Sequence, residues 1–280
     1  MDYVKPTDVL DNMLNAGATK AALAPRDLII RGMLSGGLLG ISTSLALTAT
    51  LQTNLPIIGA LIFPVGLVLI VLLGLELVTG SFALVPLARR DGRVTLSNVF
   101  SNLSFVFLGN LIGSLIYALL LYCVLTTAGN VPPDALAQKI ISIAEAKTLG
   151  YAKFGGAGLL TCFIKAILCN WMVTLGVVAA MTSSSTIGKT AAAWLPIFIF
   201  FAQGFEHSVV NMFVIPLGMM LGAKTTFAQW WLWNQIPVTL GNFIGGYLFT
   251  GLALYLTLKP KKAVAAEPSG AMGLTEIAAK

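Results

Sequence analysis

Charged residues are scarce in this chain of 280 residues. Only 10% are Asp, Glu, Lys or Arg, and 57% are hydrophobic, whereas soluble domains carry roughly 25% charged residues. This composition excludes a soluble catalytic domain and indicates a polytopic membrane protein with no nucleic-acid partner.

Cysteine and histidine are also rare. The three cysteines, Cys123, Cys162 and Cys169, lie in apolar stretches and show neither a disulfide framework nor the spacing of a zinc site. Histidine occurs once, at His207. We therefore expect no metal, no cofactor and no enzymatic activity.

Six apolar segments are long enough to cross a bilayer as helices, which takes about 20 residues each. They cover about 28–51, 57–87, 97–127, 155–182, 191–222 and 234–258. The second and fifth are too long for one simple span, and each contains a glutamate and a proline. Each is therefore expected to consist of two half-helices joined by irregular backbone, which is tolerated only where it is buried in protein or lines a cavity.

The flanking segments and the connections predict the orientation. Residues 1–25 lack the apolar core of a signal peptide; their apolar positions recur at helical spacing and predict an amphipathic helix at the membrane surface. Residues 26–258 form one transmembrane domain, and 259–280 are expected to be a disordered tail. Lysines and arginines concentrate on the side of both termini, which is therefore cytoplasmic. Trp230, Trp231 and Trp233 fit an aromatic belt at the outer interface.

The chain contains two copies of one sequence pattern. Gly74-Leu75-Glu76 is followed by Val85-Pro86-Leu87, and 130 residues later Gly204-Phe205-Glu206 is followed by Ile215-Pro216-Leu217 at the same offset. Leu-Gly-Asn at 108–110 and at 240–242 repeats likewise, with a further glycine three residues on that allows close helix packing. Each copy (about 26–127 and 155–258) holds three spans, so the second enters the membrane inverted. Inverted repeats with broken helices are typical of small-solute pores and transporters.

Few ionisable groups lie inside the spans. An intramembrane charge costs at least ~2.5–3.5 kcal/mol and is functional or tightly paired. We interpret Glu76 and Glu206 as braces that hold the two helix breaks. His207 has no counterpart in the first copy, where Leu77 stands, so we predict a functional role for it. Lys165 and its apparent repeat equivalent, Arg31, are expected to snorkel or to pair with a glutamate.

The segments Gly204-Phe205-Glu206-His207-Ser208-Val209-Val210-Asn211 and Leu168-Cys169-Asn170-Trp171 resemble the formate/nitrite transporter family, and the resemblance covers about residues 6–258. It implies an aquaporin-like fold of six spans, a homopentamer with one pore in each protomer, and passage of small monovalent anions such as formate, nitrite or hydrosulfide. It also implies a bacterial cytoplasmic membrane location.

The resemblance assigns roles by position. His207 matches the central pore histidine and Asn170 its polar partner, although the residues alone leave open whether Asn170 binds solute or holds a loop. Leu77 and Thr79 match the flexible loop of the second span. The remaining matches are Phe63, Leu67 and Phe200 with the apolar collars, and Lys147 with the vestibule lysine, for which Lys153 is an alternative.

These assignments predict an anion pore in which His207 gives a hydrogen bond or a proton to the passing anion. Passive conduction and proton-coupled transport both remain open. A neutral-solute pore of the aquaporin class requires two Asn-Pro-Ala triplets, and the sequence has none. A membrane-embedded enzyme lacks a second histidine, and a cation channel is disfavoured by the lysines at the outer mouth.

Overall fold

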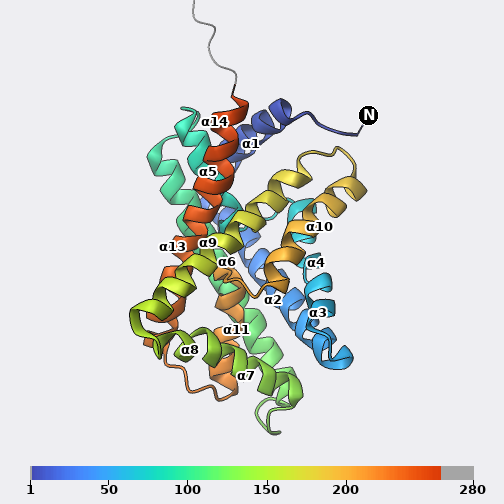
Figure 1. The fold of residues 1–280 in the computed structure, drawn as a ribbon, viewed down its shortest axis with the longest axis vertical. Helices are drawn as coiled ribbons and strands as arrows, with labels where there is room; N and C mark the ends of the chain where they lie inside the picture. The colour runs from blue at the N-terminus through green and yellow to red at the C-terminus, as the bar shows by residue number, and fades with distance from the viewer. Residues whose placement is uncertain (1, 260–280) are drawn as a thin grey trace, which may run out of the picture.

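The structure is a computed structural model, and it describes residues 2–259. These residues fold into helices and, apart from one isolated bridge between Tyr3 and Ser183, contain no β-structure. Figure 1 shows a bundle with α1 at one end and α7 with α8 at the other. The helices are α1 (Pro6–Ala21), α2 (Pro25–Thr53), α3 (Pro56–Ile62), α4 (Val65–Leu72), α5 (Val78–Arg90), α6 (Leu96–Leu125), α7 (Ala135–Lys147), α8 (Leu149–Ala152), α9 (Gly155–Ala180), α10 (Thr186–Ala202), α11 (Ser208–Leu221), α12 (Phe227–Trp230), α13 (Ile236–Gly246) and α14 (Ala253–Leu258), with π-helical turns η1 (Trp231–Gln235) and η2 (Tyr247–Leu252).

Four of the predicted spans are continuous helical stretches. They run over Pro25–Thr53, Leu96–Leu125, Gly155–Ala180 and Phe227–Leu258, and each is long and apolar enough to cross a membrane. The last begins seven residues earlier than expected, because Thr226 and Gln229 form a capping box that starts the helix there. Consequently Trp230 lies inside the helical stretch, 3% exposed, and donates to Gln235. It is a core residue of this chain, so its predicted place in an aromatic belt is wrong.

The other two apolar segments are interrupted. The helical conformation ends at Leu72 and resumes at Val78, and it ends again at Ala202 and resumes at Ser208. The glycine in each interruption, Gly74 or Gly204, has a φ of +62° or +63°, a conformation that favours glycine because it lacks a Cβ. The chain therefore leaves the helix at the two places where the sequence repeats Gly-x-Glu.

Two helix pairs cross closely, one in each copy of the repeat. A Cβ added at Gly113 of α6 would collide with the main chain of Met33 in α2. A Cβ at Gly245 of α13 would collide in the same way with Ile167 of α9. The close approach predicted from the glycine spacing is confirmed at both crossings.

The first helix packs on the body of the protein. Its predicted apolar face is buried, with Met13 0% and Leu14 3% exposed, and it contacts Leu84 and Leu87 of α5 and Tyr255 of α14. The apolar face therefore meets protein side chains. The tail predicted to be disordered lies, except for Lys259, outside the described residues.

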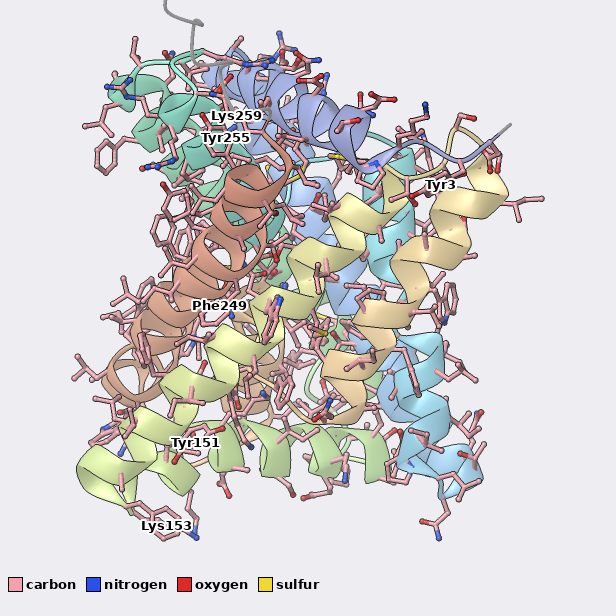
Figure 2. The ribbon with its side chains drawn as sticks, turned by 45° about the horizontal axis from the view of Figure 1, so that its top comes forward. Tyr3, Tyr151, Lys153, Phe249, Tyr255 and Lys259 are labelled. Carbon is pink, nitrogen blue, oxygen red and sulfur yellow. The ribbon has the colours of Figure 1, made fainter. Side chains whose placement is uncertain are left out.

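Asp91 joins the end of α5 to α14 beside the first helix. Its carboxylate accepts from Lys259 at 2.6 Å, from Arg93 at 2.9 Å and from the Tyr255 hydroxyl at 2.9 Å. Figure 2 shows Tyr255 and Lys259 together at this end of the molecule. Burial alone would raise the pKa of Asp91, but these hydrogen bonds outweigh it and lower the pKa to about 2.

Candidate functional site

Two asparagines hold the helix interruptions in matching ways. Asn242 of α13 donates to the carbonyls of Ala166 (2.8 Å) and Glu206 (2.9 Å) and accepts from the N–H of Ser208 (2.9 Å). All three groups lie in regions where an unpaired backbone group would be costly. The asparagine therefore ties the interruption to two neighbouring helices.

Asn110 of α6 makes the same three contacts in the first copy. It donates to the carbonyls of Gly32 and Glu76, both at 2.9 Å, and accepts from the N–H of Val78 at 2.9 Å. Both asparagines are 0% exposed. The Leu-Gly-Asn motif that repeats in the sequence therefore corresponds to a repeated set of hydrogen bonds in the structure.

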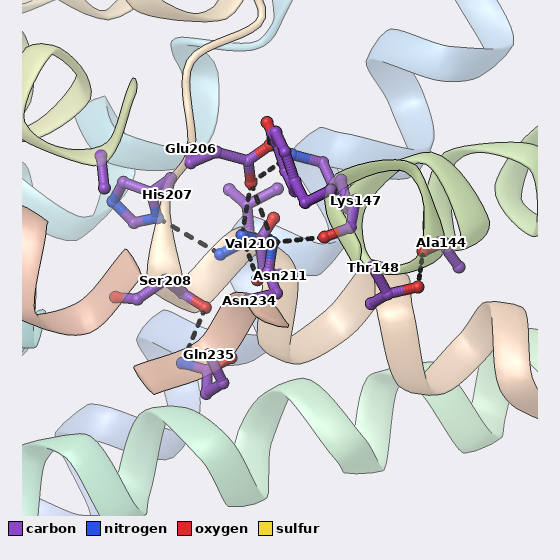
Figure 3. A network of polar contacts seen from close by, with 12 residues as sticks. Ala144, Lys147, Thr148, Glu206, His207, Ser208, Val210, Asn211, Asn234 and Gln235 are labelled. Atoms are coloured by element: carbon purple, nitrogen blue, oxygen red, sulfur yellow. Dashed lines mark hydrogen bonds and ion pairs between the residues drawn. The ribbon is translucent and has the colours of Figure 1, made fainter. Parts of the chain in front are cut away.

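Glu206 is the centre of a buried polar network, drawn in Figure 3. The glutamate is 2% exposed. Its Oε2 accepts from Lys147 Nζ and from Asn211, each at 2.8 Å, and from Asn234 at 3.3 Å. Its Oε1 accepts from the Tyr151 hydroxyl at 2.8 Å. A buried carboxylate needs such compensation, because desolvation of an unpaired charge is very costly.

Glu76 has a simpler environment. It is 2% exposed, and its Oε1 accepts from Lys20 Nζ at 2.8 Å, while its buried Oε2 has no partner among the described residues. Arg31 donates instead to the carbonyl of Gly74 at 3.4 Å. Of the two alternatives predicted for Arg31 and Lys165, pairing with a glutamate is not found among the described residues; Lys20 and Lys147, from the helices at the two ends, make those pairs.

His207 lies at the start of α11 and is 3% exposed. Its Nδ1 accepts from the Val210 N–H at 3.2 Å, and its Nε2 lies 3.0 Å from Thr79 Oγ1. A neutral imidazole that accepts at Nδ1 carries its proton on Nε2, so the ring donates toward Thr79. The ring also stacks on Phe200, with centroids 5.7 Å apart and an interplanar angle of 20°.

Asn170 belongs to the same cluster. Its amide nitrogen donates to the carbonyl of Thr79 at 3.0 Å and to that of Asn242 at 2.6 Å, so both of its N–H groups are engaged. Its Oδ1 is buried with no partner within residues 2–259. The structure thus brings His207, Thr79 and Asn170 together. Asn170 can offer a solute its Oδ1 as an acceptor, but it has no free N–H to donate.

Two cavities approach this cluster from opposite ends. The α7 cavity, of about 810 Å³, is lined by Lys147, Tyr151, Phe200 and His207 among others. The α1 cavity, of about 630 Å³, is lined by Lys20, Leu67 and Leu77 among others. The names refer to the helices at the two ends in Figure 1.

An apolar partition separates the cavities. Phe63, Leu67, Leu77 and Phe200 are each at most 3% exposed and belong to one packed cluster, in which the rings of Phe63 and Phe200 meet edge to face at 5.6 Å. Phe63, Leu67 and Phe200, which the resemblance matches with the apolar collars, therefore lie together with Leu77, predicted to be a further constriction residue in the loop of the second span. The residues that sequence reasoning missed as site members are Lys20, Tyr151, Asn211 and Asn234. Only Lys20 had a signal: it precedes Glu76 by 56 residues, much as Lys147 precedes Glu206 by 59.

The fold and these cavities define a class of protein. Over the described residues it is an all-helical, multi-pass membrane protein, with one cavity on each side of a centre that combines the polar cluster around His207 with the apolar partition. A family model described as formate/nitrite transporter matches residues 7–256. The chain belongs to the formate/nitrite transporter family.

Individual relatives agree with this membership. A probable formate transporter of Methanothermobacter thermautotrophicus is 39% identical over 203 residues, covering 70% of this chain and 73% of the relative. A solved FNT family ion channel superposes with a TM-score of 0.78 at 29% identity, covering 90% of this chain and 99% of that one. A pentameric formate channel with formate bound superposes with a TM-score of 0.68 at 26% identity, covering 83% and 97%.

Proposed function

We propose that this protein is a membrane channel for small monovalent anions, with formate and nitrite as the first candidates. The observation that carries the proposal is the placement of His207, which lines the α7 cavity at the apolar partition and points its Nε2 toward Thr79. A related protein is a formate channel that binds formate, which supports this choice of anion.

The apolar partition presents a dehydration barrier to a charged solute. Nε2–H of His207 and the hydroxyl of Thr79 are the donors nearest to it, and a hydrogen bond to a charged acceptor is about twice as strong as a neutral one. An anion that reaches His207 therefore exchanges part of its hydration for these donors. Asn170 adds an acceptor, which suits the O–H of a neutral weak acid.

The hydrogen bonds of the ring favour hydrogen-bond donation over proton donation. A neutral histidine that releases its Nε2 proton becomes an imidazolate, so it must first gain a proton at Nδ1. That nitrogen already accepts from Val210 N–H, and protonation would break this bond. We therefore favour passive anion conduction, with proton-coupled transport requiring a rearrangement at Val210.

The arrangement in the membrane completes the proposal. The two matched sets of asparagine contacts support a 3+3 inverted repeat whose second and fifth spans are broken at mid-membrane. Residues 26–258 form the pore domain, with the α7 cavity facing outward and the α1 cavity and both termini cytoplasmic. The pentameric relative supports a homopentamer, and the proposed location is a bacterial inner membrane.

Flux into proteoliposomes tests the function. Formate, nitrite, hydrosulfide and glycerol are compared under one fixed pH gradient, with empty liposomes as the background. We expect formate and nitrite flux, no glycerol flux, and strongly reduced anion flux in His207→Phe. The matched control is Gln203→Ala, because Gln203 is exposed in the same interruption. Preference for hydrosulfide would change the substrate; glycerol flux without anion flux would reject the proposal.

A further inference from the structure

Glu76 and Glu206 differ in the number of donors that reach them. In the described part of the chain, Glu206 accepts hydrogen bonds from four side chains, whereas Glu76 accepts from Lys20 alone. Both glutamates are 2% exposed, so both need compensation for the water lost on burial. Glu76 therefore has fewer donors than its burial calls for.

The surroundings of the two glutamates nevertheless share one framework. In the second half of the chain, Asn234 donates to the carbonyl of Lys147 at 3.0 Å. In the first half, Asn102 donates to the carbonyl of Lys20 at 2.9 Å. Each of these lysines pairs with the glutamate of its own half. The lysine, the glutamate and the asparagine therefore take equivalent places in the two halves.

Ser81 is the counterpart of Asn211. Each lies five residues after the glutamate of its half, and each donates its backbone N–H to the carbonyl four residues before it, at 3.0 Å. The amide nitrogen of Asn211 donates to Glu206 Oε2 and to Asn234 Oδ1, both at 2.8 Å, and so joins them. The Ser81 hydroxyl is attached directly to Cβ and is too short to join the equivalent pair.

Three polar groups of the first half are left without partners. Glu76 Oε2, the Ser81 hydroxyl and Asn102 Oδ1 are buried and make no hydrogen bond within residues 2–259. Ser81 and Asn102 are each 0% exposed. Two of the groups are acceptors, and the hydroxyl can donate. One water molecule suits such a set, since buried waters make about three hydrogen bonds to otherwise unpaired groups.

We propose that a buried water molecule takes the place of the Asn211 amide in the first half of the chain. It accepts from the Ser81 hydroxyl and donates to Asn102 Oδ1 and to the Glu76 carboxylate. A metal cation suits the place less well, because Lys20 Nζ lies 2.8 Å from the carboxylate and would repel it, and hard cations take about six or more oxygen ligands. The inference is independent of which solute the protein carries.

An electron cryo-microscopy map of the protein in nanodiscs, at a resolution that shows ordered water in the core, tests the site directly. We expect a density within hydrogen-bond distance of Ser81 Oγ and Asn102 Oδ1, unchanged when choline replaces Na⁺ and K⁺ in the buffer. In Ser81→Asn the amide nitrogen is expected at that position. No density in the parent protein, or a density that depends on the cation, overturns the proposal.

Unfolding in SDS, followed by tryptophan fluorescence, is the second measurement. Ser81→Asn is expected to raise the ratio of folded to unfolded protein about fivefold, because a protein donor replaces an immobilised water. The matched control is Ser114→Asn, since Ser114 is also 0% exposed with an unpartnered hydroxyl but packs against Gly36 of α2. There the added atoms overpack the core, and the ratio is expected to fall. A ratio for Ser81→Asn at or below that of the parent overturns the proposal.

Discussion

Replacing Lys147 with methionine tests whether the pair with Glu206 stabilises the fold. Methionine keeps most of the length of the side chain and removes its charge. The variant leaves Glu206, which is 2% exposed, without a counter-ion beside the helix interruption. We therefore expect a loss of stability as the first consequence, before any effect on anion affinity.

The expected size follows from burial. Removing one partner of a buried ion pair costs about 3–5 kcal/mol, whereas an exposed pair contributes about 0–1 kcal/mol. The Lys147 side chain is 18% exposed, and Tyr151, Asn211 and Asn234 still donate to the carboxylate. These features place the expected loss near the lower end, at about 3 kcal/mol.

The measurement is the free energy of unfolding in detergent, followed by tryptophan fluorescence during an SDS titration. Lys139→Met is the control, because Lys139 is exposed and has no partner in the described part of the chain. The double variant Lys147→Met with Glu206→Gln is expected to regain more than half of the loss, since no buried charge remains. A single variant within about 0.5 kcal/mol of the control, a difference typical of surface substitutions, would refute the reasoning.

Three further predictions concern stability. Gly204 has a φ of +63°, and Gly204→Ala is expected to lower the free energy of unfolding by about 1–2 kcal/mol through backbone strain. Steric overlap adds nothing, because the new Cβ meets no atom within 4 Å. The same SDS titration on Gly74→Ala should give the same value. Asn242→Ala leaves the carbonyl of Glu206 and the N–H of Ser208 without their partners and is expected to cost about 3 kcal/mol, which thermal unfolding in detergent would show. Because the pKa of Asp91 is about 2 in the folded protein and about 3.9 in an unfolded chain, its contribution to stability is complete above about pH 4 and is lost as the pH falls toward 2. Unfolding curves of Asp91→Asn should lack that part of the pH dependence; curves parallel to the parent between pH 5 and 3 would contradict it.

The sequence predicts the interruptions because their causes are local. Gly-x-Glu within an apolar stretch places a positive-φ residue and a charge where a helix would otherwise continue, and both interruptions occur there. The close helix crossings follow equally from glycine spacing. Such features need only the residues of one segment.

The partners of the glutamates are not predictable in this way. Lys20 lies 56 residues from Glu76 and Lys147 lies 59 residues from Glu206, and nothing in either segment says which lysine reaches which carboxylate. Sequence reasoning considered only Arg31 and Lys165, inside the spans, as possible partners of the glutamates, because the pairs that form depend on how the end helices pack. The early start of the last helix was missed for a different reason: a capping box outside the apolar segment determines it.

The two interruptions share a backbone and differ in one side chain. Leu77 has φ −122° and ψ 120°, and His207 has φ −112° and ψ 120°, so the histidine occupies the conformation that leucine occupies in the other copy. Each lines a different cavity at the same apolar partition. Only the histidine can cap its own helix through Nδ1 and still present Nε2–H to a solute. The capping bond therefore fixes the tautomer of the neutral ring, and in that tautomer Nε2 of His207 is a hydrogen-bond donor. A duplicated scaffold thus gains a hydrogen-bond donor, the one proposed to meet the anion, from a single asymmetric position.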